Sequence, residues 1–426
     1  MTPVICLSFF AACLAGIPLA FAFGVAALIG LWASGLPIEM MASKMMFAIN
    51  SFPLLAIPFF MLAGELMVRG GIVRIAIDFA NTLIGRVHGG LGYVTVGSGL
   101  GLSSVSGTAV ADAAALGSAL MGPLGRSYGR PFGAALIAAT GNLGPILPPS
   151  TAMIVYATIA GPELSLPALF IGGVMPAVII AVLMCAWVFF AAKRRGFPLT
   201  GQSFRLDVAL RSGLRALPVL VLPVIIIGGI MGGAFTATEG GAIAVVLSAL
   251  LGLFYTKELK IADFGPALMH AGFTTGVVTV IIAFASTVTF LLSIAHLPTE
   301  LRTLLQGITE DPTVFLILVF LMLVVIGMFM ESTAAYVMLV PIFAPMASAY
   351  GIDPLQFALV FILTLIVGML TPPVGALLFL MSGMTGLKVG EILREAWPYI
   401  AIQFGVTISV IFWPELYLFL PRLAGY

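Results

Sequence analysis

The chain has 426 residues, of which 61% are hydrophobic and only 8% are charged, and its mean hydropathy is +1.20. A water-soluble protein of this length needs a polar exterior, so this composition excludes one and predicts a polytopic helical membrane protein. The apolar runs are long and continuous rather than alternating, which excludes an outer-membrane barrel. The net charge of +1 gives no indication of nucleic-acid binding.

Apolar windows of about 20 residues predict the membrane-spanning segments. Their approximate bounds are 4–34, 51–68, 131–160, 167–192, 215–233, 236–255, 270–293, 356–384 and 397–419. The first run continues past Gly30 without a basic leading segment, which argues against a cleaved signal peptide. Cys6, Cys13 and Cys185 lie in apolar runs, so we expect core positions for them rather than disulfides or a metal site.

Two further regions are predicted to be re-entrant helical hairpins. The first covers 90–122 and turns at Ser103–Thr108, and its arms of about 16 residues are short for a crossing. The second covers 313–349 and turns at Glu331–Thr333. Charged amphipathic segments are expected to lie in the membrane interface as connecting arms. These segments are 35–48, 69–88, 257–268 and 296–311.

Two of the predicted spans are interrupted in the same way. The segments Gly141–Ser150 and Gly368–Gly375 are rich in glycine and proline. A lipid-exposed helix cannot contain such breaks, because the freed backbone groups would lack partners in hydrocarbon. Paired broken segments in the two halves of a membrane protein indicate the binding site of a transporter. The alternative is that glycine and proline only kink packed helices.

The two halves of the chain match at an offset close to 225 residues, since Thr108 corresponds to Thr333 and Pro149 to Pro373. This similarity predicts a duplication. Four crossings in the first half plus the extra span at 215–233 make five, so we expect the second half to be inverted. Fifteen lysines and arginines fall in loops assigned to the cytoplasm, against three on the other side. This bias places the N-terminus in the cytoplasm and the C-terminus in the periplasm.

The residues at the breaks and hairpin turns are suited to ion binding. Helix N-termini favour an anion, whereas unwound carbonyls and helix C-termini coordinate a cation such as Na⁺. The side chains add hydroxyl oxygens and one amide. They are Ser103, Ser106, Thr108, Asn142, Ser332, Thr333 and Thr371.

Several ionisable residues lie in or near the membrane. Asp112 and Glu331 are expected either to shape the site or to be structural, and Glu65 and Glu239 are expected to be structural. Three histidines fall in predicted loops or at span ends, which argues against a proton relay. They are His88, His270 and His296.

The chain has no phosphate-binding loop, and its longest hydrophilic stretch, 193–215, is a basic linker rather than an ATPase domain. We therefore expect energy to come from an ion gradient or a partner.

Four separated motifs resemble the large membrane subunit (DctM type) of a tripartite ATP-independent periplasmic (TRAP) transporter. They lie at 51–60, 141–150, 235–239 and 368–373, and the resemblance covers essentially the whole chain. One departure is that Ala237 stands where the family usually has proline, and Gly240-Gly241 where it has alanine.

The resemblance implies an all-α fold with inverted repeats, two re-entrant hairpins and two discontinuous helices, working as an elevator in the bacterial inner membrane. It implies Na⁺-coupled import of an organic acid, such as a sialic acid, a C4-dicarboxylate or another sugar acid. A periplasmic binding protein would deliver the acid, and a small four-helix membrane subunit, expected as a separate chain, would complete the complex. The transport domain would comprise 90–160 and 312–385, and the scaffold 1–89, 161–311 and 386–426.

The family's site residues carry over by position. One Na⁺ site would use Ser103, Ser106, Gly107, Gly141, Asn142, Gly144 and Pro145, and the other would use Ser332, Thr333, Gly368, Met369 and Thr371. Substrate contacts would be Thr108, Pro149, Ser150, Thr333 and Pro373. Three alternatives are a stand-alone dicarboxylate or citrate carrier, a membrane-embedded enzyme, and a non-transporting assembly or sensor subunit. An enzyme would need a convergent catalytic constellation, and the sequence offers none.

Overall fold

The protein is described by a computed structural model that covers residues 2–84, 87–199, 206–330 and 332–426, and the elements assigned in these ranges are all helices. Within them, seven helices are long and apolar enough to cross a membrane. Six correspond to predicted spans, which confirms an all-α, polytopic fold. These are η1–α4 (Phe52–Leu55 and Ala56–Arg69), α10 (Leu166–Arg195), α11 (Leu206–Met231), α12–η2 (Ala237–Leu250 and Leu251–Thr256), α13 (Ile261–Ile294) and α19 (Val389–Phe412).

The predicted single span at 4–34 is wrong. The structure has two helices here, α1 (Thr2–Leu14) and α2 (Leu19–Ser34), separated by a turn that contains Gly16 and Pro18. The two helices are antiparallel, since the ring of Phe9 lies 4.6 Å from that of Phe23 and the side chain of Ile5 packs on Gly30. A glycine with a φ of +81° followed closely by proline allows the chain to reverse where an uninterrupted apolar run predicted a helix.

Three of the four predicted arms are separate helices: α3 (Glu39–Ile49), α5 (Ile72–Ile84) and α14 (Leu297–Gln306). The fourth, at 257–268, is not, because α13 begins at Ile261 and continues without a break. The last predicted span ends at Phe412, since Pro414 starts the separate helix α20 (Pro414–Leu423).

Both predicted hairpins are present. The first consists of α6 (Gly90–Ser106) and α7 (Ala109–Tyr128), so its second arm is longer than predicted. Gly107 ends α6 in the left-handed conformation with a φ of +62°, which a residue with a Cβ adopts only with strain. The second hairpin consists of α15 (Pro312–Gly327) and α16 (Ser332–Ala349), and the carboxylate of Asp311 caps the start of α15.

Both predicted breaks are also present. One separates α8 (Arg130–Gly141) from α9 (Thr151–Ala160), and the other separates α17 (Pro354–Gly368) from α18 (Ala376–Thr385). The residues of α8 from Phe132 to Gly141 and of α17 from Leu355 to Gly368 are all buried. Turn hydrogen bonds satisfy the backbone at the first break, for example from Gly144 N to Gly141 O (3.0 Å). The first break, 141–150, is buried throughout, so it lies inside protein rather than in lipid. The second break is buried at Thr371 and Gly375 but exposes Pro373 and Val374.

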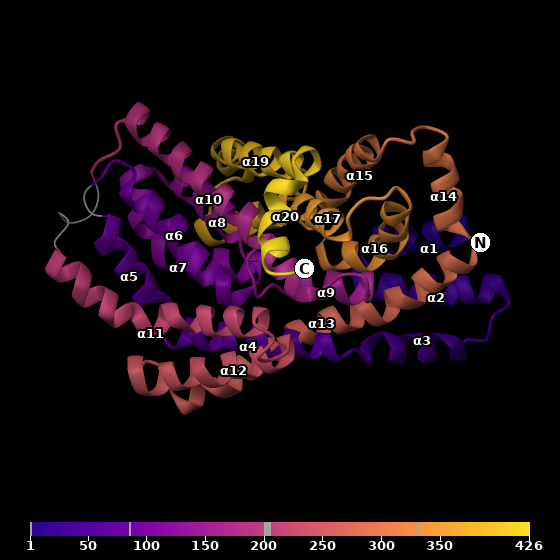
Figure 1. Ribbon diagram of the computed structural model, residues 1–426, viewed down its shortest axis with the longest axis horizontal. Coiled ribbons are helices and arrows are strands. Elements are labelled where there is room, and N and C mark those ends of the chain that lie inside the picture. Colours follow the sequence, from indigo (N-terminus) through magenta and orange to yellow (C-terminus); the bar gives the residue numbers. More distant parts are fainter. Residues whose placement is uncertain (1, 85–86, 200–205, 331) are drawn as a thin grey trace.

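The broken helices hold the two hairpins together. α8 packs on α7 and α17 packs on α15, while α9 contacts α16 and α18 contacts α7. α19 lies across α8 and α17, and α10 contacts α6, α17, α19 and α20. Helices α3, α4, α11, α12 and α13 lie along the opposite edge of the molecule, the lower edge in Figure 1. The main contacts between this row and the hairpins are those of α13 with α16 and of α4 with α6.

Candidate functional site

A buried carboxylate organises the tip of the first hairpin. Asp112 lies in the first turn of α7 and is fully buried. Its Oδ2 accepts a hydrogen bond from the Ser103 hydroxyl at 2.7 Å, and its Oδ1 accepts one from the Ser106 hydroxyl. The α7 N-terminus favours the negative charge. Asp112 thus gathers the two serines predicted for the first Na⁺ site into a single oxygen cluster.

The tip packs directly on the first break. A Cβ at Gly107 would lie 2.4 Å from the carbonyl oxygen of Pro149, and one at Gly144 would lie 2.5 Å from Asp112 Oδ2. The Thr151 hydroxyl donates to the Gly107 carbonyl at 3.1 Å. Only glycine permits approaches this close, so the two glycines place the loop beside the oxygen cluster.

Asn142 connects the first break to the second broken helix. Its amide nitrogen donates to the Ile366 carbonyl of α17 (3.0 Å) and to Gln403 Oε1 of α19 (2.7 Å). Gln403 in turn donates to the Ala139 carbonyl of α8 at 3.2 Å. One buried polar network therefore ties α8, α17 and α19 together. The Asn142 side chain is engaged with the second broken helix and not, through its nitrogen, with Ser103 or Ser106.

The second hairpin meets the second break through another close glycine contact. Gly368 ends α17 against Gly327, the last residue of α15, and a Cβ at Gly368 would lie 2.5 Å from the Gly327 carbonyl carbon. Ser332 and Thr333 begin α16, and Met369 begins the break. The Thr371 hydroxyl is buried and donates to the Val367 carbonyl at 2.8 Å. Glu331 lies outside the described residues.

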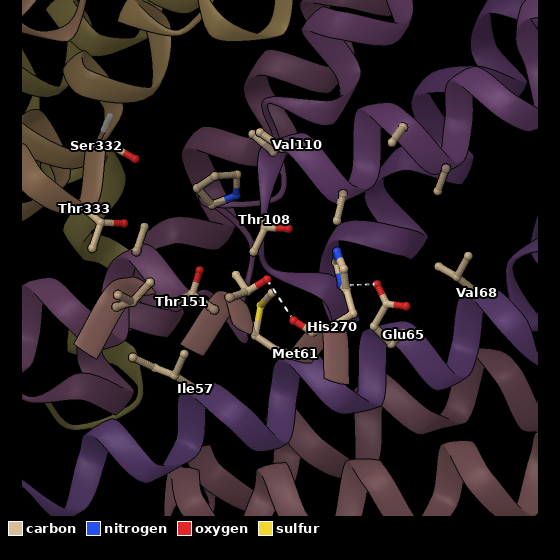
Figure 2. A pocket seen from close by; sticks show the side chains of 18 of the residues that line it. Ile57, Met61, Glu65, Val68, Thr108, Val110, Thr151, His270, Ser332 and Thr333 are labelled. Carbon is tan, nitrogen blue, oxygen red and sulfur yellow. Dashed lines mark hydrogen bonds and ion pairs between the residues drawn. The ribbon is translucent and has the colours of Figure 1, made fainter. Parts of the chain in front are cut away.

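A cavity of about 570 Å³ lies between the hairpin tips and the helices α4 and α13. This volume is in the range typical of small-molecule sites. Figure 2 shows Thr108, Thr151, Ser332 and Thr333 turned toward it from the turn of the first hairpin and from α9 and α16. Apolar side chains, among them Ile57 and Met61 of α4, form much of the rest of the wall.

Three helix N-termini lie at the cavity, and its described lining residues include no lysine or arginine. Thr108 precedes α7, Thr151 starts α9 and Ser332 starts α16, and all three residues line the cavity. The helix dipoles at these ends stabilise a negative charge. Hydroxyl groups beside them can complete the hydrogen bonding of a carboxylate.

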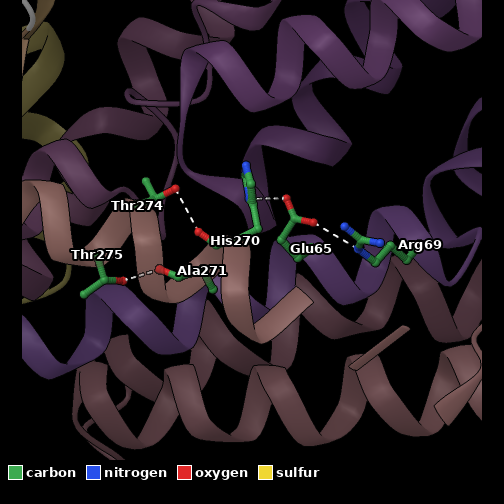
Figure 3. A network of polar contacts seen from close by, with 6 residues as sticks. All are labelled: Glu65, Arg69, His270, Ala271, Thr274 and Thr275. Atoms are coloured by element: carbon green, nitrogen blue, oxygen red, sulfur yellow. Dashed lines mark hydrogen bonds and ion pairs between the residues drawn. The ribbon is translucent and has the colours of Figure 1, made fainter. Parts of the chain in front are cut away.

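An ionisable network lies on the α4–α13 side of the same cavity. His270 Nδ1 lies 2.8 Å from Glu65 Oε1, and Arg69 Nε lies 3.2 Å from Glu65 Oε2 (Figure 3). The prediction that His270 lies in a loop or at a span end is wrong, because α13 starts nine residues earlier, at Ile261. Glu65, expected to be structural, lines the cavity together with His270.

The other predicted residues are placed as follows. Thr108, Thr333 and Pro145 line the cavity, whereas Pro149, Ser150 and Pro373 are not among its described lining residues. Ser150 caps α9 by accepting from Met153 N, and its hydroxyl donates to the Pro145 carbonyl at 2.6 Å. Glu239 forms a capping box with Thr236 at the start of α12, which confirms a structural role.

Sequence reasoning missed Met61, Thr151 and Thr274 as lining residues. No motif marks them, and only the crossing of α4 and α13 beneath the hairpin tips brings them to the cavity. Cys6 is exposed rather than in the core.

The residues present fit a sodium ion. Na⁺ is a hard cation that takes oxygen ligands, and the first tip offers the Asp112 carboxylate, two hydroxyls and the carbonyls of the adjacent break. Asn142 Oδ1 is buried and has no hydrogen-bond partner among the described residues. An unpaired buried oxygen is costly unless a cation or water meets it.

Two helical hairpins and two broken helices, together with α4 and α13, surround a largely apolar cavity whose polar groups lie at helix ends. This arrangement is typical of a membrane transporter. The family model for the DctM component of the tripartite ATP-independent periplasmic transporter matches residues 6–416, and the chain belongs to this family. Members of the family work with a small membrane subunit and a substrate-binding protein.

Relatives in sequence agree with this assignment, and a solved structure has a similar fold. The C4-dicarboxylate TRAP transporter large permease protein DctM of Pseudomonas aeruginosa is 35% identical, over 91% of this chain and 90% of that protein. The isethionate TRAP transporter permease protein DctMQ of Oleidesulfovibrio alaskensis is 33% identical over 95% of this chain, which spans only 64% of that longer protein. The YdaH transporter of Alcanivorax borkumensis has a similar fold, with a TM-score of 0.66, 14% identity and 89% of each chain covered.

Proposed function

We propose that this chain imports a carboxylate-bearing organic acid, coupled to Na⁺ entry, by an elevator mechanism. The observation that carries the proposal is the cavity on which the N-termini of α7, α9 and α16 converge, next to the oxygen cluster around Asp112. The helix ends and hydroxyls of Thr108, Ser332 and Thr333 would bind the substrate carboxylate. We keep a sialic acid, a C4-dicarboxylate and a related sugar acid as candidate substrates.

The cation sites would lie on either side of this anion. Ser103, Ser106, Asp112 and the carbonyls of the first break would hold one Na⁺, and the carbonyls around Gly368 and Met369 with the Thr371 hydroxyl would hold the other. Bound Na⁺ would supply positive charge that offsets the negative charge of the substrate. Because Gly144 contacts the Asp112 carboxylate, occupancy of the first site would also fix the loop that lines the cavity.

Packing suggests which helices would move together. α19 contacts α8 and α17, and α10 contacts α6, α17 and α19, whereas contacts with the row of α4, α11, α12 and α13 are fewer. We therefore propose a moving body of α6–α10 and α15–α20. It would include the spans 167–192 and 397–419, which the family resemblance assigned to the scaffold. Its two halves would be the inverted repeats predicted from the sequence.

The antiparallel α1–α2 hairpin changes the proposed position of the N-terminus. The basic segments 69–88 and 193–215 would face the cytoplasm, as the distribution of lysine and arginine predicts. Residues 35–38 would then be periplasmic. Because α1 runs back alongside α2, Thr2 lies at the same end as Ser34. The N-terminus would therefore be periplasmic rather than cytoplasmic, on the same side as the C-terminus.

The partners would be a small four-helix membrane subunit and a periplasmic binding protein in the bacterial inner membrane. A stand-alone carrier of dicarboxylates is the alternative, and uptake by this chain alone in proteoliposomes would favour it. Strict dependence on the added binding protein would exclude it.

The Na⁺ sites can be tested by uptake in proteoliposomes containing the complete transporter, with an acid identified by titrating its binding protein. Ser106→Ala and Thr371→Ala should raise the Na⁺ concentration required for half-maximal uptake. The matched controls are Ser104→Ala, whose hydroxyl bonds the Gly101 carbonyl, and Thr364→Ala, whose hydroxyl bonds the Val360 carbonyl. An unchanged Na⁺ response in both test variants would refute the assignment of these sites.

A further inference from the structure

We propose that His270, oriented by Glu65, binds a hydroxyl group on the substrate and selects hydroxylated monocarboxylates over dicarboxylates. This inference rests on the proposed function, because it concerns the same cavity. It assigns a specificity-determining role to the α4–α13 side, opposite the hairpin tip that carries Ser332 and Thr333 (Figure 2).

The hydrogen bond to Glu65 determines which nitrogen of His270 carries a proton. An ionised carboxylate only accepts hydrogen bonds, so at 2.8 Å from Glu65 Oε1 the Nδ1 atom must be the donor. The neutral imidazole then has its lone pair on Nε2. Figure 2 shows this second nitrogen on the edge of the ring that faces away from Glu65, in the wall of the cavity. An Nε2 lone pair accepts a hydrogen bond from a hydroxyl and repels a carboxylate.

Arg69 keeps Glu65 in place and balances its charge. The Arg69 guanidinium engages Glu65 Oε2 at 3.2 Å while His270 engages Oε1, so both carboxylate oxygens are occupied. Glu65 is the most buried of the three, with 20% of its side chain exposed against 34% for Arg69 and 57% for His270. The network therefore presents the imidazole, rather than a free carboxylate or a guanidinium, to a ligand.

Two other hydroxyls that line the cavity, Thr274 on α13 and Ser118 on α7, are engaged within their own helices. The Thr274 hydroxyl donates to the His270 carbonyl at 3.0 Å, and the Ser118 hydroxyl donates to the Ala115 carbonyl at 2.8 Å. Around them the wall is apolar, with Met61, Val110 and Val278. A second carboxylate placed here would lose its hydration without gaining a cationic partner in the lining, whereas a hydroxyl would find His270 Nε2.

The test uses three acids with six carbons each: gluconate, which carries hydroxyls, hexanoate, which carries none, and adipate, which has a second carboxylate. Their protection of the purified full chain against thermal unfolding in NaCl gives a half-maximal concentration for each acid. The wild type should prefer gluconate over both others. His270→Leu should raise the half-maximal concentration of gluconate about fivefold, the effect of one lost hydrogen bond, and leave that of hexanoate unchanged. The matched control is Thr275→Val, because Thr275 lies on the same helix and bonds the Ala271 carbonyl (Figure 3).

Glu65→Gln tests the positioning role. A glutamine amide can donate to or accept from Nδ1, so the imidazole can then present Nε2–H to a carboxylate. The half-maximal concentration of adipate should therefore fall relative to that of gluconate. Adipate binding tighter than gluconate in the wild type would overturn the inference, as would equal weakening of all three acids by His270→Leu. If none of the three acids protects the wild type in NaCl, the proposed function fails instead, because the carboxylate site is shared by all three.

Discussion

Gly144→Ala tests the contact between the first hairpin tip and the first break. The added Cβ would lie 2.5 Å from Asp112 Oδ2 and 2.9 Å from both the carbonyl carbon and the carbonyl oxygen of Thr108. Ordinary contacts to a Cβ begin near 3.4 Å, so the neighbours would have to move by roughly 0.5 to 0.9 Å. Two of the three atoms are backbone, and the third is a carboxylate oxygen held by a serine. Overpacking of this kind costs about 1–3 kcal/mol.

The displacement would separate the Asp112 cluster from the break, so stability and Na⁺ binding should fall together. The assay is the apparent unfolding temperature of the purified chain in NaCl and in KCl at equal ionic strength, where Na⁺ binding to the folded state raises the temperature. Gly144→Ala should lower stability in both salts and reduce the difference between them. Gly101→Ala, which meets no atom within 4 Å, is the control and should be neutral or slightly stabilising. A Gly144→Ala protein with wild-type stability and an unchanged sodium response would refute the packing described here.

Three further predictions concern buried or capping polar groups. Asp112→Asn keeps the size of the side chain but removes the carboxylate charge that accepts hydrogen bonds from Ser103 and Ser106. It should raise the Na⁺ concentration required for half-maximal uptake about tenfold, the equivalent of ~1.4 kcal/mol. An unchanged Na⁺ requirement would contradict a role in the cation site. Gln403→Leu should lower the free energy of unfolding by about 1–3 kcal/mol and also reduce the difference in unfolding temperature between NaCl and KCl. Gln356→Leu, which removes hydrogen bonds to Val410 and Ile411, should lower stability without changing that difference. An equal sodium response in the two variants would contradict the link between the first break and α17 through Asn142 and Gln403. Hydrogen bonds from Val314 N and Thr313 N hold the pKa of Asp311 below its usual range, so the ionised carboxylate caps α15 at neutral pH. Asp311→Ala should therefore exchange its amide protons at the start of α15 faster than the wild type at neutral pH, and the two rates should converge as the pH falls through the lowered pKa. A difference in rate that is independent of pH would contradict the capping role.

Composition and local pattern were sufficient for the fold class, the two hairpins and the two breaks. Hydrocarbon supplies no hydrogen-bond partners, so long apolar runs must be helical, and the clusters around Pro148 and Pro372 must end a helix. The same reasoning failed at 4–34, because Gly16 and Pro18 are too few to interrupt an apolar window, although they suffice to reverse the chain. It also missed that 257–268 continues into α13, since charged residues at the end of a long helix resemble an interfacial segment.

The sequence by itself therefore determined the breaks at 141–150 and 368–375, because such a break depends on a few adjacent residues and on the absence of water in the bilayer. It could not determine what meets at those breaks. Asp112 joins Ser103 and Ser106 within one hairpin, but Asn142 reaches Ile366 and Gln403 only through the packing of three helices distant in sequence. The pair of Glu65 and His270 likewise exists only because α4 crosses α13 beneath the hairpin tips. Which side chains meet across helices distant in sequence depends on how those helices pack, and only the tertiary structure determines that packing.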